Sequence, residues 1–215
     1  MAERTFRDGA RAVGPLAVAV AGFGVSFGVI ARAVGFGWLA PIVMSGTTFA
    51  GSAQFAAASI LDDGGGALAA IVAAVLLNAR YVPLSLAVAP IFPGSRRRRF
   101  LESQLIVDES WALSGRSGRF DYSILAGVGI LLYALWVGGT ALGTVVGDLL
   151  DPEAIGLDAA FPALFLALLA PYLRTRRALV TALVAGTITI VLLPFAPPGV
   201  PIVAAALAAL IGLRR

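Results

Sequence analysis

Cysteine and histidine are both absent from this sequence of 215 residues. Their absence excludes disulfides, thiol nucleophiles, Cys/His zinc sites, haem ligation by histidine and every Ser-His relay. Lysine is absent as well, so all 16 basic residues are arginine, set against 12 acidic residues. Charged residues make up only 13% of the chain, about half of what a soluble domain usually carries. A soluble metal- or cysteine-dependent enzyme is therefore not expected, and neither a metal nor a cofactor is predicted.

Hydrophobic residues, in contrast, make up 59% of the chain, which predicts an all-α, polytopic membrane bundle. A membrane-spanning helix needs about 20 apolar residues, so the apolar runs predict about six to seven membrane segments, some of them short or broken. These runs lie at 14–34, 39–61, 66–92, 122–147, 159–173, 178–195 and 200–213. We expect a single transmembrane domain over 1–215, in a prokaryotic cell membrane. No removable signal peptide is expected, because no small-residue cleavage site follows the first apolar run.

The arginines cluster in short loops, and this pattern predicts the orientation of the chain. Arginine-rich loops stay on the cytoplasmic side of a membrane, so the basic pI indicates topology and not nucleic-acid binding. The predicted cytoplasmic clusters are Arg96–Arg99, Arg116 with Arg119, Arg174 with Arg176 and Arg177, and Arg214 with Arg215. The acidic loops at 62–66 and 148–158 are predicted to lie outside. The side of the N-terminus stays open, because 39–61 either spans the membrane or re-enters it.

The segments 14–92 and 122–195 resemble each other faintly, because apolar runs of comparable kind follow in the same order. The match is either an internal repeat or a chance likeness of two apolar sequences. An odd number of crossings in each half would make them an inverted repeat, as in many transporters. A polar segment, 93–121, joins the halves and is predicted to be cytoplasmic. We expect one short interfacial helix within it, over 100–114.

The stretch "FAGSAQFAAASIL", residues 49–61, places polar side chains inside an apolar run. Close helix packing explains its small residues, but a buried glutamine in lipid also needs a polar partner or a ligand. The alternative is an unwound turn whose free backbone groups face a cavity. The second alternative makes Thr48, Gly51, Ser52 and Gln54 candidate substrate contacts.

A second polar cluster lies in "LLNARYVPLSLAVAPIF", residues 76–92. An arginine at the middle of a membrane helix costs about 2.5–3.5 kcal/mol, so Arg80 is expected to face protein or water. Pro83 removes a helix hydrogen bond and predicts a kink. Asn78 and Tyr81 are further candidates, because helical spacing places them on one face. Arg80 either snorkels and holds an acidic partner for structure, or binds a carboxylate.

The third cluster is "LIVDESWAL", residues 105–113. Asp108 and Glu109 either balance the arginines of 96–99 at an interface or turn inward. An inward Asp108 would pair with Arg80 or bind an ammonium group. A carboxylate in a low-dielectric site has a raised pKa and can carry a proton. An intramembrane aspartyl protease is not predicted, because "GTVVGD" lacks the Gly-x-Gly-Asp turn. A membrane serine protease at "GSAQ" is not predicted either, because the chain has no histidine to act as the base. No catalytic residue is therefore predicted.

Four motifs resemble the AzlC family, the large subunits of branched-chain amino acid exporters. They are "GVSFGVIARAVG" (24–35), "FAGSAQFAA" (49–57), "NARYVPLSLAVAP" (78–90) and "VDESWAL" (107–113). The resemblance covers nearly the whole chain, although Pro83 and the residues after Asn78 depart from the family pattern. It implies export of valine-like amino acids together with a small hydrophobic membrane partner of the AzlD type. Proton antiport is expected by elimination, since no nucleotide-binding motif is present. A non-transporting scaffold subunit and a passive channel remain the alternatives.

Overall fold

The computed structural model describes residues 5–116, 119–149, 166, 169–170, 173–196 and 200–208. Within these residues the chain is helical except for loops and one antiparallel pair of two-residue strands, β1 (Gly115–Arg116) and β2 (Arg119–Phe120). In this described part of the chain, three helical stretches are long and apolar enough to cross a membrane: Leu16–Ala33, Ala67–Ile91 and Tyr122–Val146. The helical membrane class expected from the composition is therefore found. The total of six to seven segments and the inverted repeat remain predictions, and most of the run at 159–173 lies outside the described residues.

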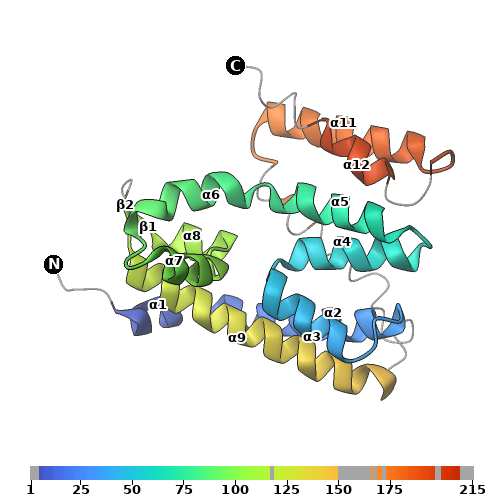
Figure 1. Ribbon diagram of the computed structural model, residues 1–215. Helices are drawn as coiled ribbons and strands as arrows, with labels where there is room; N and C mark the ends of the chain where they lie inside the picture. Colours follow the sequence, from blue (N-terminus) through green and yellow to red (C-terminus); the bar gives the residue numbers. More distant parts are fainter. Residues whose placement is uncertain are drawn as a thin grey trace. The chain divides into compact units, whose positions relative to one another are not determined.

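The chain divides into two compact units, Met1–Gly51 with Asn78–Leu150, and Ser52–Leu77 with Asp151–Arg215. The second unit contains most of α4 (Gly51–Asp62) and α5 (Ala67–Asn78), which run in opposite directions across a short turn, and also α11 (Arg176–Leu192) and α12 (Val200–Ala206). The helices α11 and α12 pack against each other (Figure 1). The hydroxyl-bearing side chain of Thr175 caps α11 by accepting a hydrogen bond from the Ala178 N–H at 3.1 Å.

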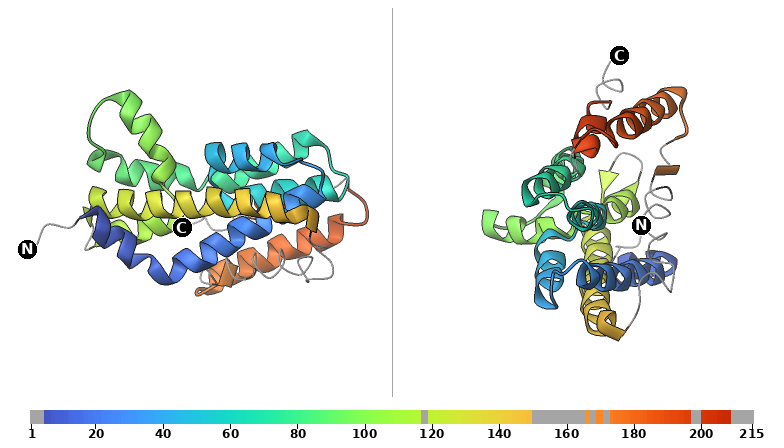
Figure 2. Two further views of the ribbon diagram at one scale, coloured as in Figure 1. Left: turned by 90° about the horizontal axis from the view of Figure 1, so that it is seen from below. Right: turned by 90° about the vertical axis from the view of Figure 1, so that its right-hand side faces the viewer.

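The first unit is organised around its longest helix, α9 (Tyr122–Val146). At 25 residues and about 1.5 Å per residue, it is longer than the hydrocarbon core of a membrane is thick. Asp121 begins the helix by accepting a hydrogen bond from the Ile124 N–H at 3.2 Å. Three other helices pack along α9 (Figures 1 and 2): α1 (Phe6–Ala12), α2 (Gly14–Ala33) and α3 (Leu39–Thr48). Helices α3 and α9 therefore lie in the same unit.

Glycines form the contact between α2 and α9. A Cβ atom added to Gly24 would lie 2.7 Å from the carbonyl oxygen of Trp136, and one added to Gly139 would lie 2.6 Å from that of Ala21. Real Cβ atoms do not come so close, so the two backbones approach to a distance that only glycine permits. Small residues that let helices touch through their backbones are typical of membrane bundles. The contact therefore gives the first unit a rigid frame.

The linker between the second and third candidate spans contains several short helices where the sequence predicted a single one. It contains α7 (Arg96–Glu102), the 3-10 turn η2 (Ser103–Leu105) and α8 (Asp108–Ser114). The single helix predicted over 100–114 is wrong, because Ile106 is extended, with a ψ of 99°, and so interrupts it. Before the linker, α6 (Tyr81–Val88) and the 3-10 turn η1 (Ala89–Ile91) complete the second span. A small core formed by Val88, Phe92, Ile106 and Leu125 joins α6, the linker and α9.

Candidate functional site

The apolar run at 39–61 breaks in its middle. Helix α3 ends at Thr48, α4 begins at Gly51, and Phe49 between them has left-handed backbone angles, φ 40° and ψ 53°. Phe49 is the only non-glycine residue with a positive φ in the described part of the chain, and such a conformation in a bulky residue persists only where the surroundings hold it. The predicted irregularity is therefore present, but it lies at Phe49 and Ala50.

The polar residues that suggested the break lie just after it, in a regular helix. Gly51, Ser52 and Gln54 occupy the first turn of α4, so the prediction that they themselves form the irregular turn is wrong. Gln54 is 0% exposed and Ser52 is also buried, whereas Thr48 is exposed. A Cβ atom on Gly51 would lie 2.8 Å from the six-membered ring of Trp136, which is itself stacked on Phe27. Gly51 therefore admits a tryptophan close to the start of α4.

The break leaves carbonyl groups at the end of α3 without partners in their own helix. Side chains from two other elements supply the hydrogen bonds. The hydroxyl of Tyr133 on α9 donates to the Gly46 carbonyl at 2.7 Å, and the amide of Gln104 in η2 donates to the Thr47 carbonyl at 2.8 Å. The ring of Tyr133 also meets the ring of Phe49 edge to face, with centroids 5.2 Å apart. These contacts explain how the break is tolerated, since unsatisfied carbonyls in a membrane cost several kcal/mol.

A second interruption separates α5 from α6. Helix α5 ends at Asn78, α6 begins at Tyr81, and Ala79 and Arg80 form the turn between them. Pro83 lies in the first turn of α6, where its missing N–H is tolerated. The predicted kink is confirmed. The prediction that Asn78 and Tyr81 share one face of a continuous helix is wrong, because the break falls between them.

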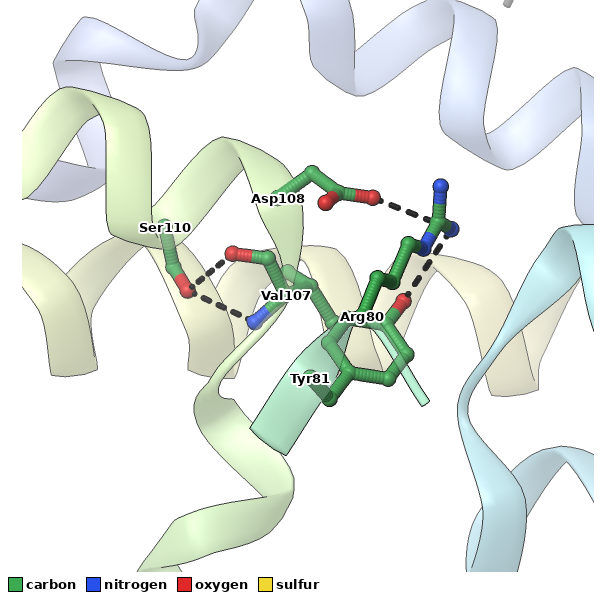
Figure 3. Close-up of polar contacts among 5 residues, drawn as sticks. All are labelled: Arg80, Tyr81, Val107, Asp108 and Ser110. Atoms are coloured by element: carbon green, nitrogen blue, oxygen red, sulfur yellow. Dashed lines mark hydrogen bonds and ion pairs between the residues drawn. The ribbon is translucent and has the colours of Figure 1, made fainter. Parts of the chain in front are cut away.

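Arg80 and Asp108 form an ion pair. The Nη2 atom of Arg80 lies 3.0 Å from Oδ2 of Asp108, and Figure 3 shows the two side chains pointing toward each other from α8 and the turn before α6. The same nitrogen lies 3.5 Å from the hydroxyl of Tyr81, and the guanidinium carbon lies 5.2 Å from the centre of the Tyr81 ring. The Arg80 side chain is 36% exposed and that of Asp108 is 30% exposed, so both ions remain accessible to a third group.

Asp108 is held at the first position of α8 by a tight local network. The hydroxyl of Ser110 accepts a hydrogen bond from the Val107 N–H at 3.0 Å and donates to the carbonyl of Leu105 at 2.7 Å or of Val107 at 3.0 Å (Figure 3). Ser110 is 0% exposed, so this network is shielded from competition by water. An aspartate in the first turn of a helix is also favoured by the helix dipole.

Glu109 follows Asp108 in the first turn of α8 but does not duplicate its role. Burial raises the pKa of the Glu109 carboxyl, its backbone hydrogen bond lowers that pKa, the neighbouring Asp108 charge raises it, and Arg80 lowers it. The net direction is upward. Glu109 is therefore able to hold a proton at a higher pH than an ordinary glutamate does.

Two further polar atoms near these elements are buried and lack a hydrogen-bond partner in the described part of the chain. They are Oδ1 of Asn78 at the end of α5 and the indole nitrogen Nε1 of Trp111 on α8. A buried polar atom without a partner is costly, which makes each of them a candidate for contact with a bound molecule. No metal site accompanies them, since the described residues contain no group of three acidic side chains that could hold a metal ion.

The structure thus brings three predicted site residues together, Arg80, Tyr81 and Asp108. Sequence reasoning missed Gln104, Ser110 and Tyr133. Gln104 and Ser110 lie in a polar linker where such residues are ordinary, and Tyr133 is one aromatic residue in an apolar helix. Their importance follows only from the carbonyls they contact: Gln104 and Tyr133 bond to carbonyls at the end of α3, and Ser110 bonds to carbonyls of its own linker.

Comparison with known proteins gives consistent results. The family model described as "AzlC protein" matches residues 15–150. An "Uncharacterized membrane protein" of Archaeoglobus fulgidus is 33% identical over 186 residues, which cover 84% of this chain and 81% of that protein. The "Branched-chain amino acid transport protein AzlC" of Bacillus subtilis is 26% identical over 151 residues, covering 66% of this chain and 58% of that protein. No solved structure matches the chain significantly.

Proposed function

Because this multi-pass membrane protein belongs to the AzlC family, we propose that it transports branched-chain, valine-like amino acids out of the cell. One of its relatives is named as a branched-chain amino acid transport protein, and this supports the substrate class. The resemblance to exporter subunits further supports a small AzlD-type membrane partner in a separate chain. The observation that carries the proposal is the Arg80–Asp108 ion pair at a break within an apolar span.

The ion pair supports a specific mode of substrate recognition. An amino acid carries a carboxylate, which a guanidinium binds with two parallel hydrogen bonds. In the structure, Asp108 contacts this guanidinium through one oxygen, Oδ2, which lies 3.0 Å from Nη2 of Arg80. The substrate carboxylate competes with Asp108 for Arg80, so substrate entry and release of Asp108 occur together. A ligand that binds only one of two arrangements shifts the protein toward that arrangement. The two states of the transporter are then Arg80 paired with Asp108 and Arg80 paired with the substrate carboxylate.

The ammonium group of the substrate needs an acceptor, and the unpartnered Oδ1 atom of Asn78 is one. Glu109, whose pKa is raised mainly by burial, is proposed as the proton carrier of an antiport cycle. The first turn of α4, with Gly51, Ser52 and Gln54 and the adjoining Thr48, is proposed as a further region of substrate contact.

Efflux of preloaded valine tests the proposal. Cells would produce the full chain with its small partner, at membrane levels matched by immunoblot. Arg80→Leu is expected to abolish efflux, while Arg80→Lys retains part of it, because lysine keeps the charge but loses the bidentate geometry. Saturation of efflux with rising internal valine separates a transporter from a passive channel. Normal efflux from Arg80→Leu would refute the proposed role of the ion pair, and no valine efflux from wild-type cells would refute the function itself.

A further inference from the structure

In the first unit, one short segment of the linker, Ser103–Ser110, contacts both the end of α3 and the turn before α6. We call this segment the strap. Near its start, the Gln104 amide donates to the Thr47 carbonyl at the end of α3, at 2.8 Å. Four residues later, Asp108 pairs with Arg80 before α6, at 3.0 Å. Both contacts lie within one compact unit. The strap therefore has one polar contact at each of the two helix breaks.

The strap is built as a stiff element. Its first turn is closed by the Ile106 N–H, which donates to the Ser103 carbonyl at 3.1 Å. Ile106 and Val107 are buried, and the Ser110 hydroxyl bonds backward to Leu105 and Val107. The strap also lies directly on α9, since a Cβ atom on Gly129 would come within 2.5 Å of the Leu105 carbonyl oxygen. A segment packed and bonded in this way moves as a unit, because packed elements have discrete arrangements.

We propose that Gln104 is a positioning residue for transport. Through its hydrogen bond to Thr47, Gln104 determines the position of the end of α3, and this position depends on whether Arg80 and Asp108 are paired. This inference rests on the proposed function. When the substrate carboxylate takes Arg80, Asp108 is released, the strap shifts, and the hydrogen bond from Gln104 to Thr47 changes with it. The break at Phe49 then responds to an event at Arg80 without any direct contact between these residues. Such an effect is a coupling free energy, which can be measured.

The donor group of Gln104 provides the first test. Gln104→Glu has the same shape but no N–H donor, so it is expected to lower the maximal rate of valine efflux about fivefold or more. Gln104→Lys keeps a donor of similar reach and is expected to retain most of the rate. A merely structural role would make both variants lose membrane protein alike, with a normal rate per molecule, and that result would overturn the proposal.

The second test is a double-mutant cycle between the two ends of the strap. Asp108→Asn releases the strap from Arg80, so Gln104→Glu added to it is expected to change the maximal rate by less than twofold. Tyr122→Phe is the control, because its hydroxyl accepts a long, exposed hydrogen bond from Arg98 and takes no part in the contacts of Gln104 with Thr47 or of Arg80 with Asp108; its effect is expected to be the same with and without Asp108→Asn. Additive effects of Gln104→Glu and Asp108→Asn would overturn the coupling. Normal efflux from both Arg80→Leu and Asp108→Asn would instead refute the proposed function of the pair.

Discussion

The hydroxyl of Tyr133, near the middle of α9, donates a 2.7 Å hydrogen bond to the carbonyl of Gly46 in the last turn of α3. This bond joins residues 87 positions apart in the sequence, and it satisfies a carbonyl that a continuous helix would have bonded internally. Together with the Gln104 bond to Thr47, it accounts for a helix that ends inside an apolar run. The break is therefore a built feature of the fold.

Tyr133→Phe tests this role of the hydroxyl. The variant keeps the ring that meets Phe49 but leaves the Gly46 carbonyl without its partner, which is expected to cost about 1–3 kcal/mol. We expect a lower melting temperature of the purified protein and slower valine efflux. Tyr122→Phe is the matched control, because its hydroxyl accepts a long, exposed hydrogen bond from Arg98, at 3.4 Å. Equal melting temperatures for the two variants would contradict the role of Tyr133.

The glycine contact between α2 and α9 offers a comparison of adjacent residues. Gly139→Ala places a methyl carbon 2.6 Å from the Ala21 carbonyl oxygen, whereas a Cβ atom on Gly138 meets nothing within 4 Å. Overpacking of this kind typically costs about 1–3 kcal/mol. We expect Gly139→Ala to lower the melting temperature in detergent clearly, and Gly138→Ala to leave it unchanged or raise it slightly, since alanine favours helix. A reversed order would mean that α2 and α9 do not touch at Gly139.

Glu109 predicts a pH dependence of stability. Its pKa in the folded protein is raised above the ordinary value of 4.5, first by burial. A raised pKa means that the folded state binds the proton more tightly than the unfolded state. The stabilisation is therefore complete below about pH 4.5 and is lost as the pH rises through the folded pKa. Glu109→Gln removes this loss, so thermal melting from pH 4 to 8 is expected to show a flatter profile and a more stable variant at neutral pH. If the melting temperature of Glu109→Gln depended on pH as steeply as that of the wild type, a group other than Glu109 would be responsible for the pH dependence.

Much of the architecture was predictable from the sequence, because it depends on local composition. Hydropathy located the helices of the first half, Pro83 located the interruption before α6, and the position of Arg80 in an apolar run demanded a polar partner, which is Asp108. The family resemblance stated from four motifs is also confirmed.

The contacts across the fold were not predictable in the same way. Phe49 carries the left-handed backbone, although its sequence neighbour Gly51 was the residue type that prefers such angles. Gly51 instead serves the close approach of Trp136, a residue far along the chain. Gln104 and Tyr133 matter through carbonyl groups, which every residue has and no sequence pattern marks. The division of the linker into α7 and α8 depends on the Ser110 hydroxyl closing back on Leu105.

The central claim is that the substrate carboxylate and Asp108 compete for Arg80, and equilibrium binding of radiolabelled valine to the purified protein tests it most directly. Removing the competitor strengthens substrate binding, and removing the arginine abolishes it. Asp108→Asn is therefore expected to lower the Kd for valine, by about tenfold if about 1.4 kcal/mol of competition is relieved. Arg80→Leu should show no saturable binding, and valinamide, which lacks the carboxylate, should not displace valine from the wild-type protein or from Asp108→Asn. Weaker valine binding by Asp108→Asn, or unchanged binding by Arg80→Leu, would contradict the account.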